Sequence, residues 1–315
     1  MPDDPDEPFV IKTILNACGK PTSGQANRVG PPLLQAGDDA AMVSNSDAVT
    51  VDTMVEGIHW DDRLSAEDVG WKLVAANVSD INAMGGLPSW AVLSIALPSP
   101  LDRGWVTSFA LGLAEAAHRW GVHLVGGDTT GSPGPRMVSL TLCGHVEVPI
   151  GRHGARPGDD LWVSGALGGA AAGFGMGAHA NDALRRPSPP VGLGAALAAT
   201  GGVSAMMDLS DGLRMDLHRL CAASGVGAEV VPGDLPAHPD AAACPDPIRM
   251  MTGFGEEYEL LFTARPSSAA AIEAAASDFD RAPVRIGRIN GQASHGAQLK
   301  GMAWPPLAFS HFGDA

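Results

Sequence analysis

The sequence predicts two globular domains that each contain helices and strands. Three observations support this prediction. A chain of 315 residues has room for about two domains of ordinary size. Its first half alternates apolar, β-rich runs with helical patterns. A joint rich in Gly, Pro and Arg, GRHGARPGDD at 151–160, then precedes a second series of such signals. We therefore place the domains at 1–150 and 151–315.

The first half predicts four strands and two helices. Short runs rich in Val, Ile, Leu and Thr indicate strands, and apolar residues that recur every three or four positions indicate helices. The expected strands are 48–55, 90–97, 122–125 and 137–146, and the expected helices lie near 66–84 and 103–120.

The second half continues with the same kinds of signal. Strands and helices are expected in the runs LWVSG, GGAAAGFGM, SAMMDLS, DGLRMDLHRLCAAS, AEVV, YELLFTA and VRIGRI. Residues 183–192, ALRRPSPPVG, predict a proline-rich surface loop.

Composition excludes several classes of protein. Hydrophobic residues make up 45% and charged residues 17%, which is typical of a globular protein. The formal charge of −15 argues against nonspecific binding to nucleic acid or to an anionic membrane. Four cysteines without a CxxC pair indicate neither a disulfide scaffold nor a zinc site. The same cysteine usage favours a reducing cytoplasm, and because the start MPDDPDEPF is acidic we expect no targeting segment.

Acidic residues recur at the ends of apolar runs. A single such motif is usually a turn or a helix cap, so the weight of the pattern comes from its recurrence. Mg²⁺ is normally shared between carboxylates and substrate phosphates, so converging acids would let this acidic chain bind phosphate. The residues are Asp38 and Asp39 in GDDAAMV, Asp52, Glu56 and His59 in TVDTMVEGIH, Asp80, Asp128 in VGGDTT, Asp208 and Asp211 in MMDLSDGL, and Glu256 and Glu257 in GEEYELLF.

Asp80 is the most unusual of these acids, because it is the only charged residue between Lys72 and Asp102. A buried carboxylate must be solvated, paired or bound to a cation. On the expected helix 66–84 it shares a face with Asn77, and the apolar flanks of that face favour a metal ligand over a wet surface.

The run MMDLSDGL suggests a phosphate site. Asp208 and Ser210 would point the same way at a strand end, and Asp211 is expected to cap a helix that begins near Leu213. A helix N-terminus beside bound Mg²⁺ is a plausible seat for phosphate oxygens. Without the rest of the family pattern, His59 is expected to be an ordinary packing or surface residue.

Seven separated motifs resemble one family in its own order. GDDAA, VDTMVEGIH, NVSDINAMGGLP, VGGDTT, the joint, DLSDGL and EYELLFT are similar to those of the thiamine-monophosphate kinases, over about residues 8 to 313. That family belongs to a wider ATP-using group with aminoimidazole ribonucleotide synthetase and selenophosphate synthetase. The resemblance implies two α+β domains of the aminoimidazole ribonucleotide synthetase-like fold. It also implies a homodimer in which the N-terminal sheets of two chains form a barrel.

The resemblance further implies Mg²⁺-dependent transfer of the ATP γ-phosphoryl group to thiamine monophosphate, which gives thiamine diphosphate. The implied catalytic carboxylates are Asp80, Asp128 and Asp211. The implied metal positions, for several Mg²⁺ ions, are Asp38, Thr50, Asp52, Asp80, Asp128, Asp208 and Asp211. The implied ATP contacts are Gly127, Asp128, Arg152 and Ser210, with Phe109 beside the nucleotide, and the implied substrate contacts are His59, Glu256 and Phe309.

The chain departs from the family pattern in two places. The family usually has Gly-Gly-Glu-Asp-Tyr-Glu-Leu where this chain has GFGEEYEL, which puts Phe254 in place of a glycine and Glu257 in place of an aspartate. The tail reads SHF where DHF is expected.

Two alternative functions remain open from the sequence. The run ACGK at 17–20 suggests a selenophosphate synthetase-like activity, since that family uses a reactive Cys and a Lys near its N-terminus. A noncatalytic nucleotide or metal sensor on the same scaffold is the other alternative.

Overall fold

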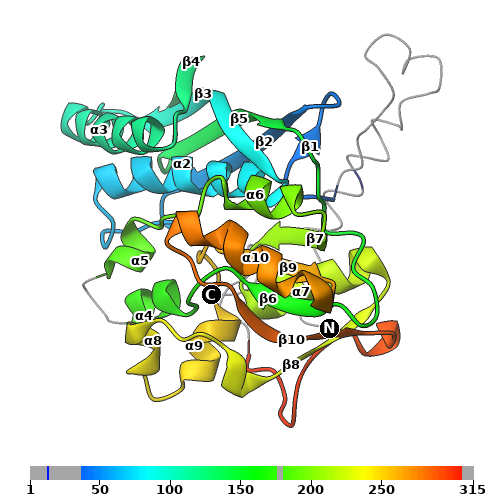
Figure 1. The fold of residues 1–315 in the computed structure, drawn as a ribbon. Coiled ribbons are helices and arrows are strands. Elements are labelled where there is room, and N and C mark those ends of the chain that lie inside the picture. Colours follow the sequence, from blue (N-terminus) through cyan, green and yellow to red (C-terminus); the bar gives the residue numbers. More distant parts are fainter. Residues whose placement is uncertain (1–12, 14–36, 176–179, 307–315) are drawn as a thin grey trace.

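The computed structural model describes Thr13 and residues 37–175 and 180–306, and it contains two mixed β-sheets (Figure 1). The first sheet is formed by residues before the joint at 151–160, and the second by residues after it. Helices pack on both sheets, so the predicted pair of α+β domains is confirmed.

The N-terminal sheet has five strands in the order β1-β2-β5-β3-β4. All neighbours are antiparallel except β3 and β4, which are parallel. Every expected strand and helix of this half forms, and β3 and β4 extend beyond the predicted ranges. The elements are β1 (Ala41–Met42), β2 (Asp47–Val55), α2 (Ala66–Ala83), β3 (Gly86–Pro98), α3 (Arg103–Arg119), β4 (His123–Ser132) and β5 (Met137–Val146).

The two faces of this sheet differ. Residues such as Ala48, Leu140 and Leu142 are buried beneath helix α2. On the opposite face, Val51 is 60% exposed and Trp90 is 43% exposed. Strand pairing puts these two side chains on the same side, because Val49 and Trp90 both lie opposite Cys143. One face of the sheet is therefore open in a single chain.

Helix α2 is buried on nearly all sides. Ser65 begins it with a capping box: its hydroxyl accepts from the Asp68 N–H, and the Asp68 carboxylate accepts from the Ser65 N–H. The helix packs against β2, β3 and β5 of the first sheet and against β7 and α6 of the second domain. The end of α2 that carries Asp80 therefore lies between the two domains, and Asp80 is only partly exposed.

The C-terminal sheet has six strands in the order β11-β8-β10-β6-β9-β7, and only β11 and β8 are parallel. The strands are β6 (Asp160–Val163), β7 (Val203–Asp208), β8 (Gly227–Val230), β9 (Leu260–Ala264), β10 (Val284–Asn290) and β11 (Ala297–Leu299). The helices are α4 (Gly169–Gly175), α5 (Asp182–Arg185), α6 (Leu193–Ala199), α7 (Leu213–Ser224), α8 (Pro239–Ala242), α9 (Pro247–Gly253) and α10 (Ala269–Ala276).

Helices cover both faces of this second sheet. Leu161 and Val163 of β6 pack in a core with Leu217 of α7. Trp162, between them, packs in a separate core with Leu197 of α6 and Ile272 of α10. Because both faces are covered, every residue of β6 and β9 is buried, without alternation between buried and exposed positions.

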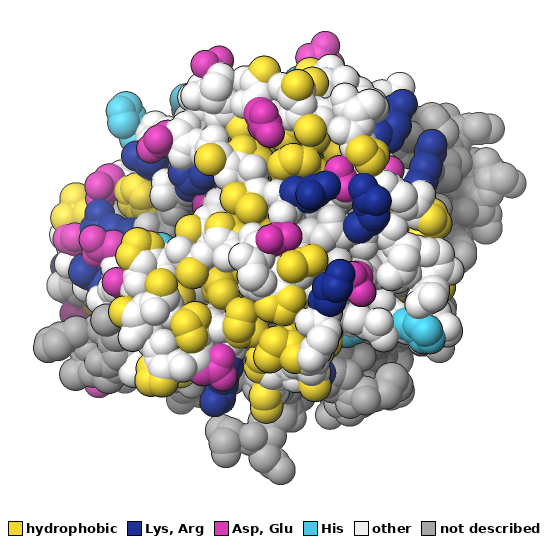
Figure 2. All heavy atoms as spheres, turned by 60° about the horizontal axis from the view of Figure 1, so that its bottom comes forward, with side chains coloured by type: hydrophobic (Ala, Val, Ile, Leu, Met, Phe, Trp, Pro, Cys, Tyr) yellow, Lys and Arg dark blue, Asp and Glu magenta, His cyan; other side chains and the backbone are white. Residues whose placement is uncertain are grey.

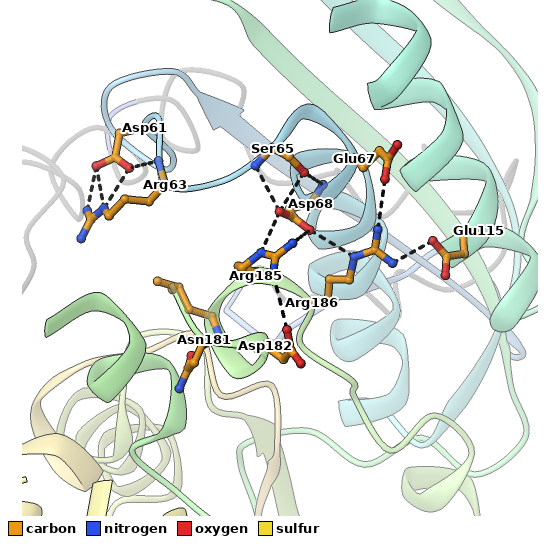
Figure 3. A network of polar contacts seen from close by, with 11 residues as sticks. Asp61, Arg63, Ser65, Glu67, Asp68, Glu115, Asn181, Asp182, Arg185 and Arg186 are labelled. Atoms are coloured by element: carbon orange, nitrogen blue, oxygen red, sulfur yellow. Dashed lines mark hydrogen bonds and ion pairs between the residues drawn. The ribbon is translucent and has the colours of Figure 1, made fainter. Parts of the chain in front are cut away.

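The prediction of a proline-rich surface loop at 183–192 is right only in part, because residues 186–192 form neither helix nor strand but are largely covered. The segment begins within α5, and Pro187, Pro189 and Pro190 are buried. Figure 3 shows Arg185 and Arg186 pointing at Asp68, the N3 residue of α2. The Pro187 carbonyl accepts from the Trp71 indole N–H at 2.8 Å. Local composition indicated a loop, but these contacts join the segment to the start of α2.

The surface carries mixed charge on the face seen in Figure 2. There, the Lys and Arg side chains of the described residues lie among acidic and apolar ones, so they form no continuous basic area. Within the part of the chain that the structure describes, no helix combines the length and the apolar character needed to cross a membrane.

Helices α2 and α3 approach closely through two glycines. A Cβ on Gly112 would lie 1.9 Å from the Glu67 carbonyl oxygen, and one on Gly70 would lie 2.3 Å from the Phe109 oxygen. We expect Gly112→Ala to lower the free energy of unfolding by about 1–3 kcal/mol, because the helices must move apart. Urea unfolding measures this, with Leu111→Ala on the exposed face as a control expected within about 0.5 kcal/mol. Equal stability of the two variants would contradict the close packing.

Candidate active site

Three carboxylates from distant parts of the chain meet at the junction of the domains. Asp39 precedes β1, Asp80 lies in the last turn of α2, and Asp208 ends β7. One oxygen from each lies within 4.8 Å of the others. The burial of α2 between the two domains brings these acids together.

Neighbouring polar groups orient each member of this acidic cluster. The Thr50 hydroxyl donates to Asp80 Oδ2 at 2.5 Å, and the Ser79 hydroxyl donates to Asp208 Oδ2 at 2.7 Å. Arg152 Nη2 lies 2.5 Å from Asp39 Oδ1, and its backbone N–H donates to Asp38 Oδ1 at 2.8 Å. Asp38, the residue before Asp39, is therefore not part of the cluster and instead binds the backbone of the joint at Arg152.

Burial controls the protonation of these acids. It raises the pKa of Asp39 and of Asp52 from 3.8 to about 6. For Asp80, burial and then the negative charges of Asp52 and Asp208 raise the pKa well above its ordinary value. The pKa of Asp208 is raised in the same way by burial and by Asp39. The neighbouring cations, such as Arg152 beside Asp39, compensate the negative charges of the cluster only in part.

The cluster fits a hard divalent cation. Asp39 Oδ2 and Asp52 Oδ2 are buried, and neither has a hydrogen-bond partner among the described residues. Such unsatisfied carboxylate oxygens are costly, and oxygen is the ligand that Mg²⁺ prefers. The residues able to hold Mg²⁺ here are Asp39, Asp80 and Asp208, with Asp52 beside them.

The run MMDLSDGL differs from its prediction in the residue that caps the following helix. Helix α7 does begin at Leu213, but Gly212 is its N-cap and makes no side-chain cap. Asp211 instead pairs with Arg219. The buried carboxylate of Asp216 accepts from the N–H groups of Asp211 and Gly212, at 3.0 and 2.9 Å. The pKa of Asp216 is raised to about 8, first by burial and then by Asp211.

A pocket of about 450 Å³ lies beside the cluster. Five of the predicted site residues line it: Asp52, His59, Ser210, Asp211 and Glu256. The imidazole Nδ1 of His59 accepts from the Val55 N–H at 3.0 Å. The pocket thus gathers residues from β2, from the loop after it, and from the two loops that flank β7 and β9.

A buried cation supports one wall of this pocket. Lys72 of α2 is 1% exposed and its Nζ donates to Glu256 Oε2 at 2.6 Å. Glu256 and Tyr258 have φ of 67° and 51°, and their N–H groups donate to Ser210 and Leu209. These bonds hold the segment 254–258 against the loop that carries Asp211.

Some predicted residues lie elsewhere. Asp128 is exposed on β4, at the edge of the described sheet, and two strands separate β4 from β2. At ~4.8 Å per strand this is about 14 Å, so Asp128 does not join the cluster within one chain. Phe109 is 2% exposed and stacks on Trp105 in the core. Phe309 and Cys18 lie outside the described residues.

Gly127, next to Asp128, is held close to β3. Its φ is 157°, and a Cβ at this position would lie 1.9 Å from the Leu93 carbonyl oxygen. Only glycine allows this approach.

Three residues of the site were not predicted from the sequence. Asp39 stood in the GDDAA motif, but Asp38 was taken as the ligand, and adjacent acids cannot be told apart without the fold. Lys72 had a usable signal, since it is a lone cation at the start of a long apolar stretch. Asp216 had none, because an acid inside a helical pattern is usually exposed.

Comparisons with known proteins give one family. Residues 37–146 match the model of the AIR synthase related protein N-terminal domain, and residues 156–300 match that of the C-terminal domain. The chain is 34% identical to a thiamine-monophosphate kinase of Rhodopirellula baltica, over 92% of this chain and 91% of the relative. It is 36% identical to one of Haemophilus influenzae, over 82% and 83%.

Solved structures agree with these matches. A thiamine-monophosphate kinase from Stenotrophomonas maltophilia superposes with a TM-score of 0.75 and 36% identity, over 86% of this chain and 92% of that one. A structure described as AaThiL complexed with AMPPCP and TMP gives a TM-score of 0.78 and 31% identity, over 88% and 91%.

The raised pKa values predict the pH dependence of stability. When the pKa of a carboxyl is higher in the folded state, the unfolded chain loses its proton first, so stability falls as pH rises between the two values. Asp39 and Asp52 cover the window from 3.8 to about 6, and Asp216 extends it to about 8. The shifts of Asp39 and Asp52 are each worth on the order of 3 kcal/mol, and the larger shift of Asp216 is worth about twice as much.

We therefore expect the free energy of unfolding in EDTA to fall from pH 5 to pH 8, and Mg²⁺ to restore it most strongly at pH 8. Urea unfolding at several pH values measures both effects. Asp80→Asn should raise the metal-free stability at pH 8 and abolish the response to Mg²⁺. A metal-free stability that rises over this range would contradict the assignment.

Proposed function

The chain belongs to the family of thiamine-monophosphate kinases, which are ATP-dependent phosphotransferases, and we propose that it transfers the γ-phosphoryl group of ATP to thiamine monophosphate with Mg²⁺ held by its acidic cluster. The observation that carries this proposal is the meeting of Asp39, Asp80 and Asp208 beside a pocket lined by His59 and Glu256. The relative that holds AMPPCP and TMP together supports the pairing of these two ligands.

The chemistry explains why a strongly acidic site suits two anionic substrates. Both reactants carry phosphate, so the barrier is charge repulsion and alignment. Bound Mg²⁺ supplies positive charge to phosphate oxygens. No side chain has to act as a covalent nucleophile, and the acids serve by holding the metal.

The residues around the cluster have separate roles in this proposal. Asp39, Asp80 and Asp208 would hold Mg²⁺, and Asp38, Thr50, Asp52 and Asp211 would lie around it. Arg152 and Ser210 face the ATP phosphates. His59 and Glu256 contact the acceptor, and the buried Lys72 holds the Glu256 carboxylate in place through an ion pair.

We also propose that the chain is a homodimer whose N-terminal sheets face each other in a barrel. The open face of the first sheet supports this, because Val51 and Trp90 are large apolar side chains left in water. The position of Asp128 and Gly127 on the edge strand β4 supports it as well. Both would contribute to an ATP site only in an assembly of two chains.

The first test is ADP release as a function of Mg²⁺, with and without thiamine monophosphate. We expect release that requires both, and Asp80→Asn should lower kcat by roughly a hundredfold or more, since several kcal/mol of charge stabilisation is lost. Asp182→Asn, whose side chain is 94% exposed, is the control and should be unchanged. Binding of ATP with Mg²⁺ but no ADP would favour a sensor, and selenide-dependent hydrolysis would favour the other alternative.

The dimer has its own test. Light scattering at micromolar concentration should give the mass of two chains, and Val51→Asp should shift it toward one, because a charge would be buried in the barrel. Leu101→Asp, also at an exposed apolar position but outside the strands, is the control. A single-chain mass for the unsubstituted protein would refute the proposal.

A further inference from the structure

The pocket has two chemically different parts. Asp52, Ser210 and Asp211 line the part beside the acidic cluster. The remaining wall is mostly apolar and includes Ile58 and Phe174, which are 53% and 48% exposed. Large apolar side chains left open inside a pocket point to a ligand with an apolar part.

Two phenylalanines and one arginine form the centre of this apolar wall. The rings of Phe174 and Phe254 have centroids 5.1 Å apart and are tilted by 35°. The Arg63 guanidinium lies 4.0 Å from the centre of the Phe174 ring, and its Nη1 donates to the Phe174 carbonyl at 3.0 Å. Figure 3 shows the Asp61 carboxylate accepting from the same guanidinium. The wall is thus built from both domains and already binds one cation over an aromatic face.

The backbone conformation at Phe254 does not require any particular residue type. Its φ of −131° and ψ of 147° are ordinary extended values that any residue adopts. The backbone that follows Phe254 is held in place. Gly255 lies against the Ser210 carbonyl, and the Glu256 N–H donates to the same carbonyl at 2.9 Å. The ring therefore projects from a firmly held segment, two residues from the predicted acceptor contact Glu256.

We propose that Phe254, with Phe174, is a specificity residue that stacks on the heteroaromatic part of the acceptor. This inference rests on the proposed function. Thiamine monophosphate joins a cationic thiazolium ring and a pyrimidine to a phosphate, and this polarity matches an aromatic wall at one side of the pocket and an acidic cluster at the other. Aromatic faces attract such cationic, planar rings. The adenine of ATP is the competing occupant, and it is less suited because His59 and Glu256 share this pocket.

The test separates ring binding from phosphate binding. Phe254→Leu keeps apolar volume against the core but removes the ring, and Phe254→Tyr keeps the ring. We expect Phe254→Leu to raise the KM for thiamine monophosphate about tenfold, which corresponds to about 1.4 kcal/mol, with kcat and the KM for ATP within about twofold. Phe254→Tyr should behave like the unsubstituted protein. Phe279→Leu, in a separate core cluster, is the matched control and should change neither KM.

Calorimetry with thiamine alone and with inorganic phosphate alone provides a readout independent of turnover. Phe254→Leu should weaken thiamine binding about tenfold and leave phosphate binding unchanged. An unchanged KM for thiamine monophosphate, or a rise confined to the KM for ATP, would overturn the inference, as would a Phe254→Tyr variant as weak as Phe254→Leu. Absence of turnover in the unsubstituted protein would instead refute the proposed function, and the calorimetry would still decide the role of the ring.

Discussion

The burial of helix α2 between the two domains is the constraint on which the site depends. It carries the Asp80 carboxylate into an interior where Asp39 and Asp208 also end. Three neighbouring carboxylates cannot all be ionised without compensation, and Arg152 pairs with only one of them. The cluster must therefore either be partly protonated or bind a cation. The raised pKa values and the unsatisfied oxygens are two consequences of the same excess of negative charge.

The charged contacts at the start of α2 serve a different purpose from those at its end. Asp68, 1% exposed, is the N3 partner of the capping box and also accepts from Arg185 and Arg186 (Figure 3). Here every carboxylate oxygen has a partner, and the pKa of Asp68 is lowered. The helix is thus held by satisfied charges at one end and presents unsatisfied ones at the other. A satisfied network adds rigidity, whereas an unsatisfied one creates a binding site.

The asymmetry of the pocket follows from where its walls originate. The N-terminal domain supplies Asp52, His59 and Arg63 from β2 and the loop after it, and the C-terminal domain supplies Phe174 and the segment 254–258. The pocket therefore forms only when the two domains are packed together. Arg63 and Phe174 contact each other across this junction, and so do Lys72 and Glu256. Both contacts link domain packing to the shape of the acceptor site.

Much of this protein was determined by its sequence alone. Apolar periodicity located the strands and helices because it reflects local backbone geometry, and Asp80 stood out because a lone charge in an apolar helix needs a partner. Only the tertiary structure decided which acids meet. It brought Asp39 rather than Asp38 to Asp80, and it paired Asp211 with Arg219 instead of a helix end. It also buried the prolines of the segment 183–192 and left Asp128 on an edge strand. Most of these outcomes depend on contacts between residues far apart in the chain, such as Asp80 with Asp208 and Asp68 with Arg185, which no local pattern encodes.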